Sequence, residues 1–420
     1  MRYRPGSQPY PTRQCPLCGW RKSRRIFRQM FTSFSERGLL EGYDVVVCGR
    51  CGFGFADHIP APERFDAYYS EMSKYEGPRE GTKVAPEDLS RFYAIAEELR
   101  PLIGKRDQIL EIGCSSAHLL ACLREAGFPN VVGVDPSARC AAEAQRRHGI
   151  TVLTGSLASL YEDLRRRGPF GVILMIGVLE HIPDLDQVLR SIHELTAGGG
   201  RICVEVPDST RFARWIDAPY QQFSVEHINY FSPSSLRRLL ALKGFRDVRT
   251  RILTRAHTAK SMMPVINSVS EHIAVGSHAG QRDQSDPTER ALTLYVRRSA
   301  EFEKSIHRQI DRLAQLKTPV VIWGTGTLTQ RLLATGGLSQ VRIAAFVDSN
   351  PHYQGKTLQG VPILSPDALR MSEEPILIAS LTFQDEIEYQ LRSEFRLTNP
   401  VWKLGEESLG AGQEGCDGVH

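Results

Sequence analysis

The loop before residue 233 pairs an acid with an imidazole, and these two groups suit proton transfer. Glu226 and His227 are adjacent, among the polar and aromatic residues of 220–233. Ser232 and Pro233 suit the N-cap and first turn of a helix, so the segment before them is expected to be a loop. Histidine titrates near neutral pH and a carboxylate can orient it, which makes His227 with Glu226 a candidate general base. The alternative is a structural histidine that hydrogen-bonds the loop.

Two Cys-x-x-Cys pairs near the N-terminus could bind a metal. They are Cys15 with Cys18 and Cys48 with Cys51, 30 residues apart, and a glycine follows each pair. Four thiolates fill a tetrahedral zinc site and leave no open position, so the spacing predicts a structural zinc. Two disulfides are the alternative, but nine cysteines, an odd number in a long chain, favour a reducing compartment such as the cytoplasm.

A third chemical pattern lies in residues 109–135. An apolar strand enters a small-residue turn at Gly113, a helix follows, and a second strand ends on Asp135, 22 residues after the glycine. In nucleotide-binding βαβ units, such a turn approaches the ligand and the acid accepts from a ribose. The turn lacks the other glycines of the dinucleotide fingerprint, so dinucleotide binding is the weaker interpretation. A doubly wound domain without a nucleotide is the alternative.

The elements that must position these residues alternate between strands and helices. Strands are expected at 150–153, 171–176 and 202–206, with helices at 157–167 and 185–195. This alternation predicts an α/β fold with a parallel sheet covered by helices on both faces. Ligands of such sheets bind outside the carboxyl ends of the strands. The predicted rim consists of Gly113, Asp135, Gly155, Ser156, Met175, Gly177 and residues 205–208.

The N-terminal flank is basic and then rich in tyrosine. Residues 1–30 carry eight Arg or Lys and no acid, although the net charge of +4 does not by itself imply a polyanionic partner. Tyr68 and Tyr69 are interpreted as packing residues, and the helix that begins at Pro86 is expected to dock on the sheet. No apolar run approaches the roughly 20 residues of a membrane span, so a cytoplasmic protein is expected.

The C-terminal flank contains a second strand–turn–helix pattern. Residues 256–287 are expected to be a connector and 288–316 a long amphipathic helix. Gly324 and Gly326 then follow a strand, and Asp348 ends the next one. This spacing predicts either a nucleotide site or a purely structural Rossmann-like domain.

The turn at 111–117 resembles the first motif of class I S-adenosylmethionine-dependent methyltransferases. That motif is acid-x-Gly-x-Gly-x-Gly, and Ser115 and Ala117 stand in for the later glycines. Residues 177–184 resemble the segment after the fourth strand, which borders the methyl donor in many of these enzymes. The resemblance implies a Rossmann-like domain whose donor-binding residues are Glu111, Gly113, Ser115, Ala117, Asp135, Ser156, Met175 and Gly177.

The whole chain resembles, more narrowly, the zinc-containing sugar C-methyltransferases of deoxysugar biosynthesis. That family methylates C3 of a nucleotide-linked 4-keto sugar. The resemblance implies a catalytic Glu226–His227 pair, with Tyr75 and His181 also in the site. In one departure, Ser224 replaces the family's tyrosine two places before the glutamate. In the other, the family's glycine-rich stretch is missing from residues 254–270.

The resemblance implies a methyltransferase domain flanked by an N-terminal four-cysteine zinc module and a C-terminal Rossmann-like α/β domain. The oligomeric state is left open. The expected segments are a zinc module with its basic arm (1–62), a helical connector with the site tyrosine (63–103), the methyltransferase domain (104–255), a linker with the long helix (256–317), the Rossmann-like domain (318–404) and a disordered tail (405–420).

Three other functions compete with this prediction. Zinc-bearing RNA methyltransferases also join a cysteine module to this fold, and the basic arm favours them because Arg and Lys neutralise phosphates. An RNA enzyme does not need the second Rossmann-like domain, so a nucleic-acid substrate is disfavoured. A small-molecule O-methyltransferase and a scaffold that only binds the methyl donor are the remaining alternatives.

Overall fold

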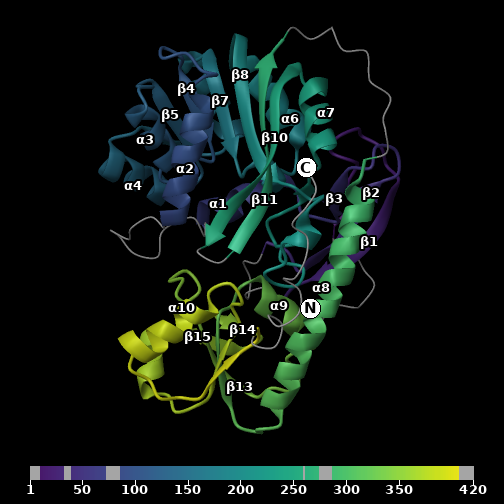
Figure 1. The fold of residues 1–420 in the computed structure, drawn as a ribbon, viewed down its shortest axis with the longest axis vertical. Coiled ribbons are helices and arrows are strands. Elements are labelled where there is room, and N and C mark those ends of the chain that lie inside the picture. The colour runs from purple at the N-terminus through teal and green to yellow at the C-terminus, as the bar shows by residue number, and fades with distance from the viewer. Residues whose placement is uncertain (1–9, 33–38, 72–85, 259–260, 274–285, 406–420) are drawn as a thin grey trace, which may run out of the picture. The chain divides into compact units, whose positions relative to one another are not determined.

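The structure is a computed structural model, which describes residues 10–32, 39–71, 86–258, 261–273 and 286–405 (Figure 1). The chain divides into two compact units. Tyr75 and residues 406–420 of the predicted tail lie outside the described residues. Among those described, no helix is both long enough and apolar enough to cross a membrane. The first unit contains Met1–Gln29, Leu39–Trp215 and Gln222–Leu294, and the second contains Met30–Gly38, Ile216–Gln221 and Tyr295–His420.

A seven-stranded sheet forms the centre of the first unit. Its strand order is β10-β11-β8-β7-β4-β5-β6. Strands β4 to β8 run parallel, whereas β11 pairs antiparallel with both β8 and β10. The predicted parallel α/β sheet is therefore confirmed. The strands are β4 Ile109–Ile112, β5 Val131–Asp135, β6 Val152–Thr154, β7 Phe170–Ile176, β8 Thr196–Pro207, β10 Phe245–Thr258 and β11 Ser261–His272.

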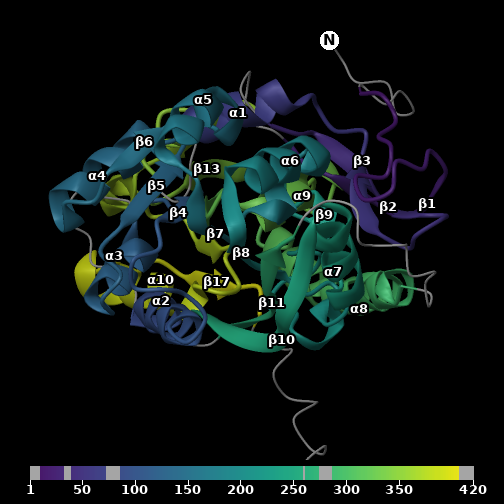
Figure 2. The same cartoon turned by 90° about the horizontal axis from the view of Figure 1, so that it is seen from above.

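Helices cover both faces of this sheet (Figure 2). Helices α2, α3 and α4 supply buried side chains to the core on one face, and α5, α6 and α7 to the core on the other. In α6, Leu185, Leu189 and Ile192 are buried at helical spacing, which is why this helix packs on the sheet. The helices are α2 Pro86–Leu99, α3 His118–Glu125, α4 Ala138–His148, α5 Leu157–Arg167, α6 Leu185–Leu195 and α7 Pro233–Leu242.

Side-chain caps determine where the helices next to the rim begin. Ser156 accepts a main-chain N–H bond at the start of α5, and Asp184 does so at the start of α6. Ser232 and Ser235 form a reciprocal capping box around Pro233. Helix α7 thus starts where the sequence predicts, and the residues before Ser232 form a loop.

A second, four-stranded sheet of the first unit joins the cysteine segment to that loop. Its order is β1-β2-β3-β9, with β1 Ser23–Met30, β2 Gly42–Cys48, β3 Gly54–Asp57 and β9 Asn229–Tyr230. Strand β9 begins two residues after His227 and pairs antiparallel with β3. Helix α1, Pro62–Glu71, follows β3. The cysteine segment is therefore continuous with the candidate catalytic loop through one sheet.

Residues 256–272 correct the expectation of a connector. Within the described part of this stretch, 256–258 form the end of β10 and 261–272 form β11, which lies between β10 and β8. Serines that contributed to the expectation of a connector are buried inside the sheet, as Ser268 and Ser270 show, and so is Asn267. Buried polar groups are tolerated where hydrogen bonds satisfy them, and Asn267 donates to Glu205 at 3.1 Å. Polar composition therefore misidentified an inner strand.

The second unit, described by itself, is also an α/β fold. Its sheet order is β14-β15-β13-β12-β16-β17, and only β14 pairs antiparallel among the described strands. The predicted strand–turn–helix start is present as β12, α9 and β13. The strands are β12 Val320–Trp323, β13 Ile343–Val347, β14 Thr357–Leu358, β15 Val361–Leu364, β16 Ile376–Ile378 and β17 Val401–Lys403. The helices are α8 Thr288–Ala314, α9 Thr327–Ala334 and α10 Gln384–Tyr389, and the boundary between the units falls within α8.

Candidate active site

The turn between β4 and α3 holds three residues in the left-handed backbone region. Gly113, Ser115 and Ala117 have φ angles of 70°, 48° and 60°. A Cβ on Gly113 would lie 2.7 Å from Cγ2 of Val178, so the close approach of these atoms requires glycine. The N–H groups of Gly113 and Cys114 both donate to the carbonyl of Val134, so this backbone closes the turn against β5. Ser115 and Ala117 thus adopt the backbone expected of the glycines they replace.

Asp135, at the end of β5, clamps this turn. Its Oδ2 accepts the N–H of Ser115 at 2.8 Å, and its Oδ1 accepts that of Ser137 at 2.9 Å. A carboxylate oxygen can accept more than one hydrogen bond, so the clamp does not exclude a contact to a ribose hydroxyl. The acid therefore shapes the turn and borders the space into which the turn opens.

The other predicted donor-binding residues reach the rim in different ways. Gly177 follows β7 with a φ of 70°, and its N–H donates to the carbonyl of Glu205 at 2.8 Å. Ser156 follows β6 as the N-cap of α5. The side chain of Met175 is fully buried in the core, so its main chain alone can border a ligand. Burial, and then the neighbouring Asp135, raise the pKa of Glu111 well above its usual range, which favours a neutral carboxyl.

The predicted catalytic residues come together with residues of α1 and of the segment after β7. The Tyr68 hydroxyl donates to Oε1 of Glu226 at 3.1 Å. The Nδ1 of His181 lies 3.0 Å from the Tyr69 hydroxyl and 3.1 Å from the Glu226 carbonyl. The rings of His181 and His227 meet edge to face, with centroids 4.9 Å apart. Glu226, His181 and His227 therefore form one cluster.

Tyr68 and Tyr69 do not serve packing alone, and that interpretation is wrong. Both rings are half-buried, and both hydroxyls contact residues of the catalytic cluster. Helical spacing cannot distinguish a packing tyrosine from one whose hydroxyl reaches a partner more than a hundred residues away. Their closeness to Tyr75, which lies outside the described residues, was the one available signal.

Glu180 is a residue of this cluster that sequence reasoning missed. It is buried in the short helix Leu179–His181, and its Oε1 lies 3.9 Å from Nε2 of His181. A carbonyl can only accept, so the contact with Glu226 places the proton of His181 on Nδ1 and turns its Nε2 lone pair toward Glu180. Ligand atoms of Glu180, His181 and His227 lie within 4.8 Å of one another. Such closely spaced acceptors can share a proton.

Ser224 explains how the loop is held without the tyrosine of the related family. Its Oγ accepts the N–H of Glu226 at 3.3 Å and that of His227 at 3.1 Å. Its carbonyl accepts the hydroxyl of Tyr43, from β2, at 2.8 Å. The serine hydroxyl therefore organises the main chain of the two candidate catalytic residues.

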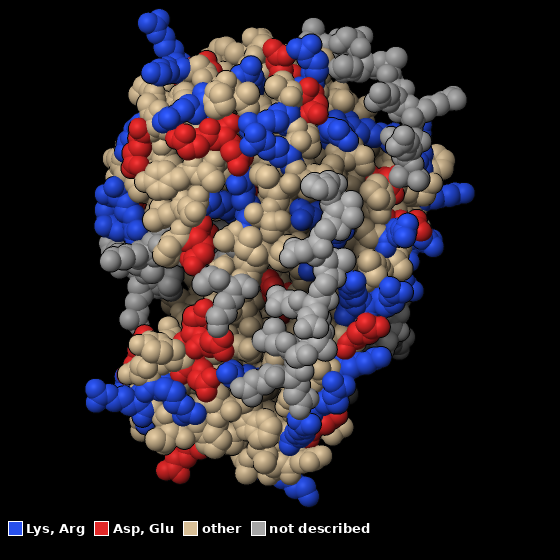
Figure 3. All heavy atoms as spheres, viewed as in Figure 1, with Lys and Arg blue, Asp and Glu red and all other residues tan. Residues whose placement is uncertain are grey.

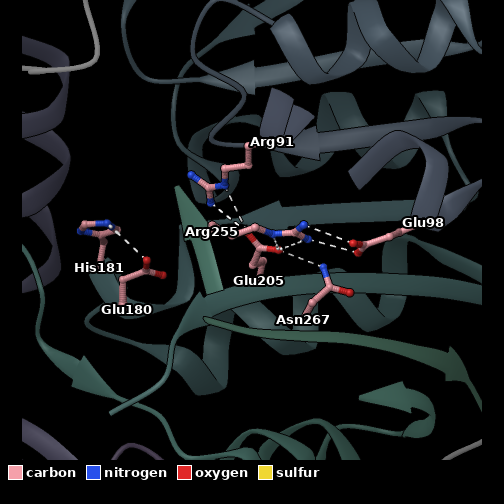
Figure 4. A network of polar contacts seen from close by, with 7 residues as sticks. All are labelled: Arg91, Glu98, Glu180, His181, Glu205, Arg255 and Asn267. Carbon is pink, nitrogen blue, oxygen red and sulfur yellow. Dashed lines mark hydrogen bonds and ion pairs between the residues drawn. The ribbon is translucent and has the colours of Figure 1, made fainter. Parts of the chain in front are cut away.

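A buried ion-pair network lies at the carboxyl end of β8 (Figure 4). Glu205 is fully buried and accepts from Arg91 at 3.0 Å and from Arg255 at 2.9 Å. Arg255 also contacts Glu98 of α2 at 3.1 Å. The sequence placed Glu205 at the rim, but the two arginines were missed because α2 and β10 supply them from distant parts of the chain. The network ties α2 to the sheet beside the turn.

The four cysteines of the two pairs form one cluster. Sγ of Cys15 lies 3.6 Å from that of Cys51, and the same distance separates Cys18 from Cys48. A disulfide needs about 2.05 Å, whereas sulfurs around a tetrahedral zinc lie about 3.8 Å apart, given Zn–S bonds near 2.3 Å. Hydrogen bonds among the thiols raise the pKa of Cys15 to about 12 and lower that of Cys48 to about 2. The donor set and its spacing fit zinc.

Comparison with known proteins identifies the domain. Residues 87–250 match the family model "Methyltransferase domain", and residues 316–396 match "C2185-like, N-terminal". The chain is 28% identical over 334 residues to the C-methyltransferase NovU of Streptomyces niveus, which covers 77% of this chain and 76% of that protein. It is 32% identical over 109 residues to a ubiquinone biosynthesis O-methyltransferase of Ralstonia nicotianae, which covers 24% of this chain and 43% of that one.

A solved structure is also similar. The 1,6-didemethyltoxoflavin-N1-methyltransferase of Burkholderia thailandensis is 18% identical, with a TM-score of 0.38, and the match covers 53% of this chain and 96% of that one. The family match and the similarity to NovU agree with the strand order and the glycine turn described above. The chain is an S-adenosylmethionine-dependent methyltransferase with a Rossmann-like class I domain.

Proposed function

We propose that this enzyme methylates a carbon beside the ketone of a nucleotide-linked keto-deoxysugar. The supporting observation is the cluster of Glu226, His181 and His227 with the hydroxyls of two tyrosines. A C–H bond has no lone pair, so a carbon acceptor needs a base and a neighbouring carbonyl that takes up the charge. The similarity over most of the chain to NovU, a C-methyltransferase, supports carbon as the acceptor.

In this mechanism His227 removes the proton alpha to the ketone. S-adenosylmethionine, when bound, supplies the electrophilic methyl group to the resulting enolate carbon. The Tyr69 hydroxyl is a candidate donor to the enolate oxygen, and Nε2 of His181 becomes one when it carries the proton shared with Glu180. Glu226 keeps the loop in place through Tyr68 and through its own carbonyl. Tyr75 is proposed as a further donor on the resemblance alone, because it lies outside the described residues.

His227→Ala tests the mechanism. General-base assistance is typically worth about 10²- to 10⁴-fold, so methyl transfer should fall on that scale while donor affinity stays unchanged. With an unreactive donor analogue and thymidine diphosphate 4-keto-6-deoxyglucose bound, the wild type should exchange deuterium from heavy water into the position alpha to the ketone. The variant should not. Exchange and methylation at the wild-type rate would show that His227 is structural.

O-methylation is the second candidate, because the chain also resembles O-methyltransferases of ubiquinone biosynthesis over a quarter of its length. Product analysis separates the two: a methyl group on oxygen with no deuterium exchange refutes the carbon proposal.

An RNA substrate has less support. On the face seen in Figure 3, Lys and Arg are interspersed with Asp and Glu and form no continuous basic surface. RNA that co-purifies and is released by salt would contradict this view.

We also propose one structural zinc per chain at the four-cysteine cluster. The support is the sulfur spacing given above, and zinc bound there would add its binding free energy to folding. Metal analysis of protein purified under reducing conditions should find about one zinc per chain. Cys18→Ser should lower zinc retention and the melting temperature of the first unit together. Zinc-free protein with an unchanged melting temperature would refute a structural role.

A further inference from the structure

We propose that Arg13 is a positioning residue that couples the four-cysteine module to the placement of the catalytic loop, an inference that rests on the proposed role of His227. Arg13 lies two residues before Cys15. Its side chain reaches the backbone on both sides of the catalytic cluster. It would therefore transmit the state of the metal module to residues that touch the substrate.

One guanidinium holds acceptors from three separate segments. Nη1 donates to the carbonyls of Ala56 in β3 and Ile228, both at 3.3 Å. Nη2 donates to Oδ1 of Asn229 at 3.1 Å and also to the carbonyl of Pro183. The planar fork of arginine suits several acceptors at fixed angles, which a lysine ammonium cannot reproduce.

Two of these segments carry the catalytic cluster. Ile228 directly follows His227, and Pro183 comes two residues after His181. The N–H of Ile228 donates to the carbonyl of Glu180 at 2.8 Å, which joins the two segments directly. Arg13, which belongs to the four-cysteine module, bridges the same two segments through the carbonyls of Ile228 and Pro183. A shift of its backbone would therefore move both histidine segments.

Asn229 completes the bridge between the two segments. Its Nδ2 donates to the carbonyls of Leu179 and Ile182, both at 2.8 Å, while its Oδ1 accepts from Arg13. Every polar atom of this buried side chain amide is thereby used. Loss of the arginine would leave Oδ1 of Asn229 and the carbonyls of Ala56 and Pro183 to find other donors, and the loop would relax to do so.

The main chain of Arg13 is fixed by the module itself. Its N–H donates to Oδ1 of Asp57, and the guanidinium lies 5.8 Å from the ring centroid of Phe55. The next turn closes on Cys15, whose carbonyl accepts from Gly19 at 2.8 Å. Zinc bound at the cysteines would hold this turn, and with it the arginine.

The test compares Arg13→Gln with Arg25→Gln, since Arg25 lies in β1 of the same module with a largely exposed side chain. A misplacement of about 1 Å can cost on the order of 100-fold in rate, so Arg13→Gln should slow deuterium exchange about 10- to 100-fold. Zinc content and donor affinity should match the wild type. Arg25→Gln should behave as the wild type throughout, and Arg13→Lys should recover only part of the rate.

Two further measurements separate positioning from general damage. In the His227→Ala background, Arg13→Gln should lower the residual rate by less than about twofold, because both changes act on one step. Equal losses in both backgrounds would refute positioning through the base. Imidazole NMR signals of His181 and His227 should shift in Arg13→Gln and in chelator-treated wild type, and unchanged signals would overturn the inference. If His227→Ala exchanges deuterium at the wild-type rate while the imidazole signals shift in Arg13→Gln, His227 is not the base but the coupling through Arg13 stands.

Discussion

The two units contain nearly the same strand–turn–helix frame, and they differ in how the turn is completed. In the first unit, Oδ2 of Asp135 accepts the N–H of Ser115 at 2.8 Å; in the second, Oδ2 of Asp348 accepts that of Thr325 at 2.9 Å. Each acid also accepts the N–H of the second residue after it through Oδ1. The acid at the end of the second strand is thus a clamp on the turn in both units.

The turns diverge in backbone and side chains. Gly113, Ser115 and Ala117 alternate in the left-handed region, whereas Gly324 alone does so within residues 324–326. In the second turn, the Thr325 hydroxyl also donates to Asp348 at 2.6 Å. In the second turn a hydroxyl of the chain thus already donates to the acid. Glycine and acid spacing therefore predicts the clamp, while ligand binding depends on what fills the space beside it.

The largest expected difference between the turns comes from Gly113→Ala and Gly324→Ala. A left-handed alanine costs about 1 kcal/mol, and the clash with Val178 adds roughly 1 to 3 kcal/mol at Gly113. At Gly324 the nearest atom to a Cβ would be 3.8 Å away, so only the backbone cost remains. Chemical unfolding should show the first unit losing about 2 to 4 kcal/mol and the second about 1. Equal losses would mean that the two turns are equally open.

Asp135→Ala and Asp348→Ala test whether only one clamp also binds the donor. Hydrogen bonds to charged groups are worth about 1.5 to 3 kcal/mol, so the first change should weaken S-adenosylmethionine binding about ten- to a hundredfold. Calorimetry should find the wild-type dissociation constant for Asp348→Ala. If Asp348→Ala weakened S-adenosylmethionine binding, or if Asp135→Ala left it unchanged, the assignment of the two turns would be wrong.

A smaller difference should appear with pH. His118 begins α3 after the first turn, and its Nδ1 lies 2.9 Å from Nε2 of His148. Burial, and then His148, lower the pKa of His118 to about 4. Because the unfolded state protonates near pH 6.5, the free energy of unfolding should fall as the pH drops from about 6.5 to 4. Urea midpoints of the first unit should show this loss, and His118→Gln should reduce it. The helix after the second turn, α9, begins with Thr327, which does not titrate, so this position adds no such pH dependence to the second unit.

Local patterns predicted most elements near the site. The helical period located α5 and α6, and the serine–proline cap located the start of α7. The same patterns failed at 261–272, because an inner strand buried on both faces can carry several serines. They also misassigned Tyr68 and Tyr69, since the spacing of tyrosines in α1 does not record the hydrogen-bond partners of their hydroxyls.

The sequence by itself determined the features that depend on near neighbours. These are the two cysteine knuckles, the turn at Gly113 with its acid, and the adjacent Glu226 and His227. Tertiary structure alone decided that Asn229 and Tyr230 would form β9 and pair with β3. It also decided that Arg13 would reach the carbonyls beside the catalytic cluster. Backbone pairing and carbonyl contacts leave no periodicity in the sequence. They depend on which distant segments the folded core brings together, and here the cysteine sheet provides the edge on which the catalytic loop docks.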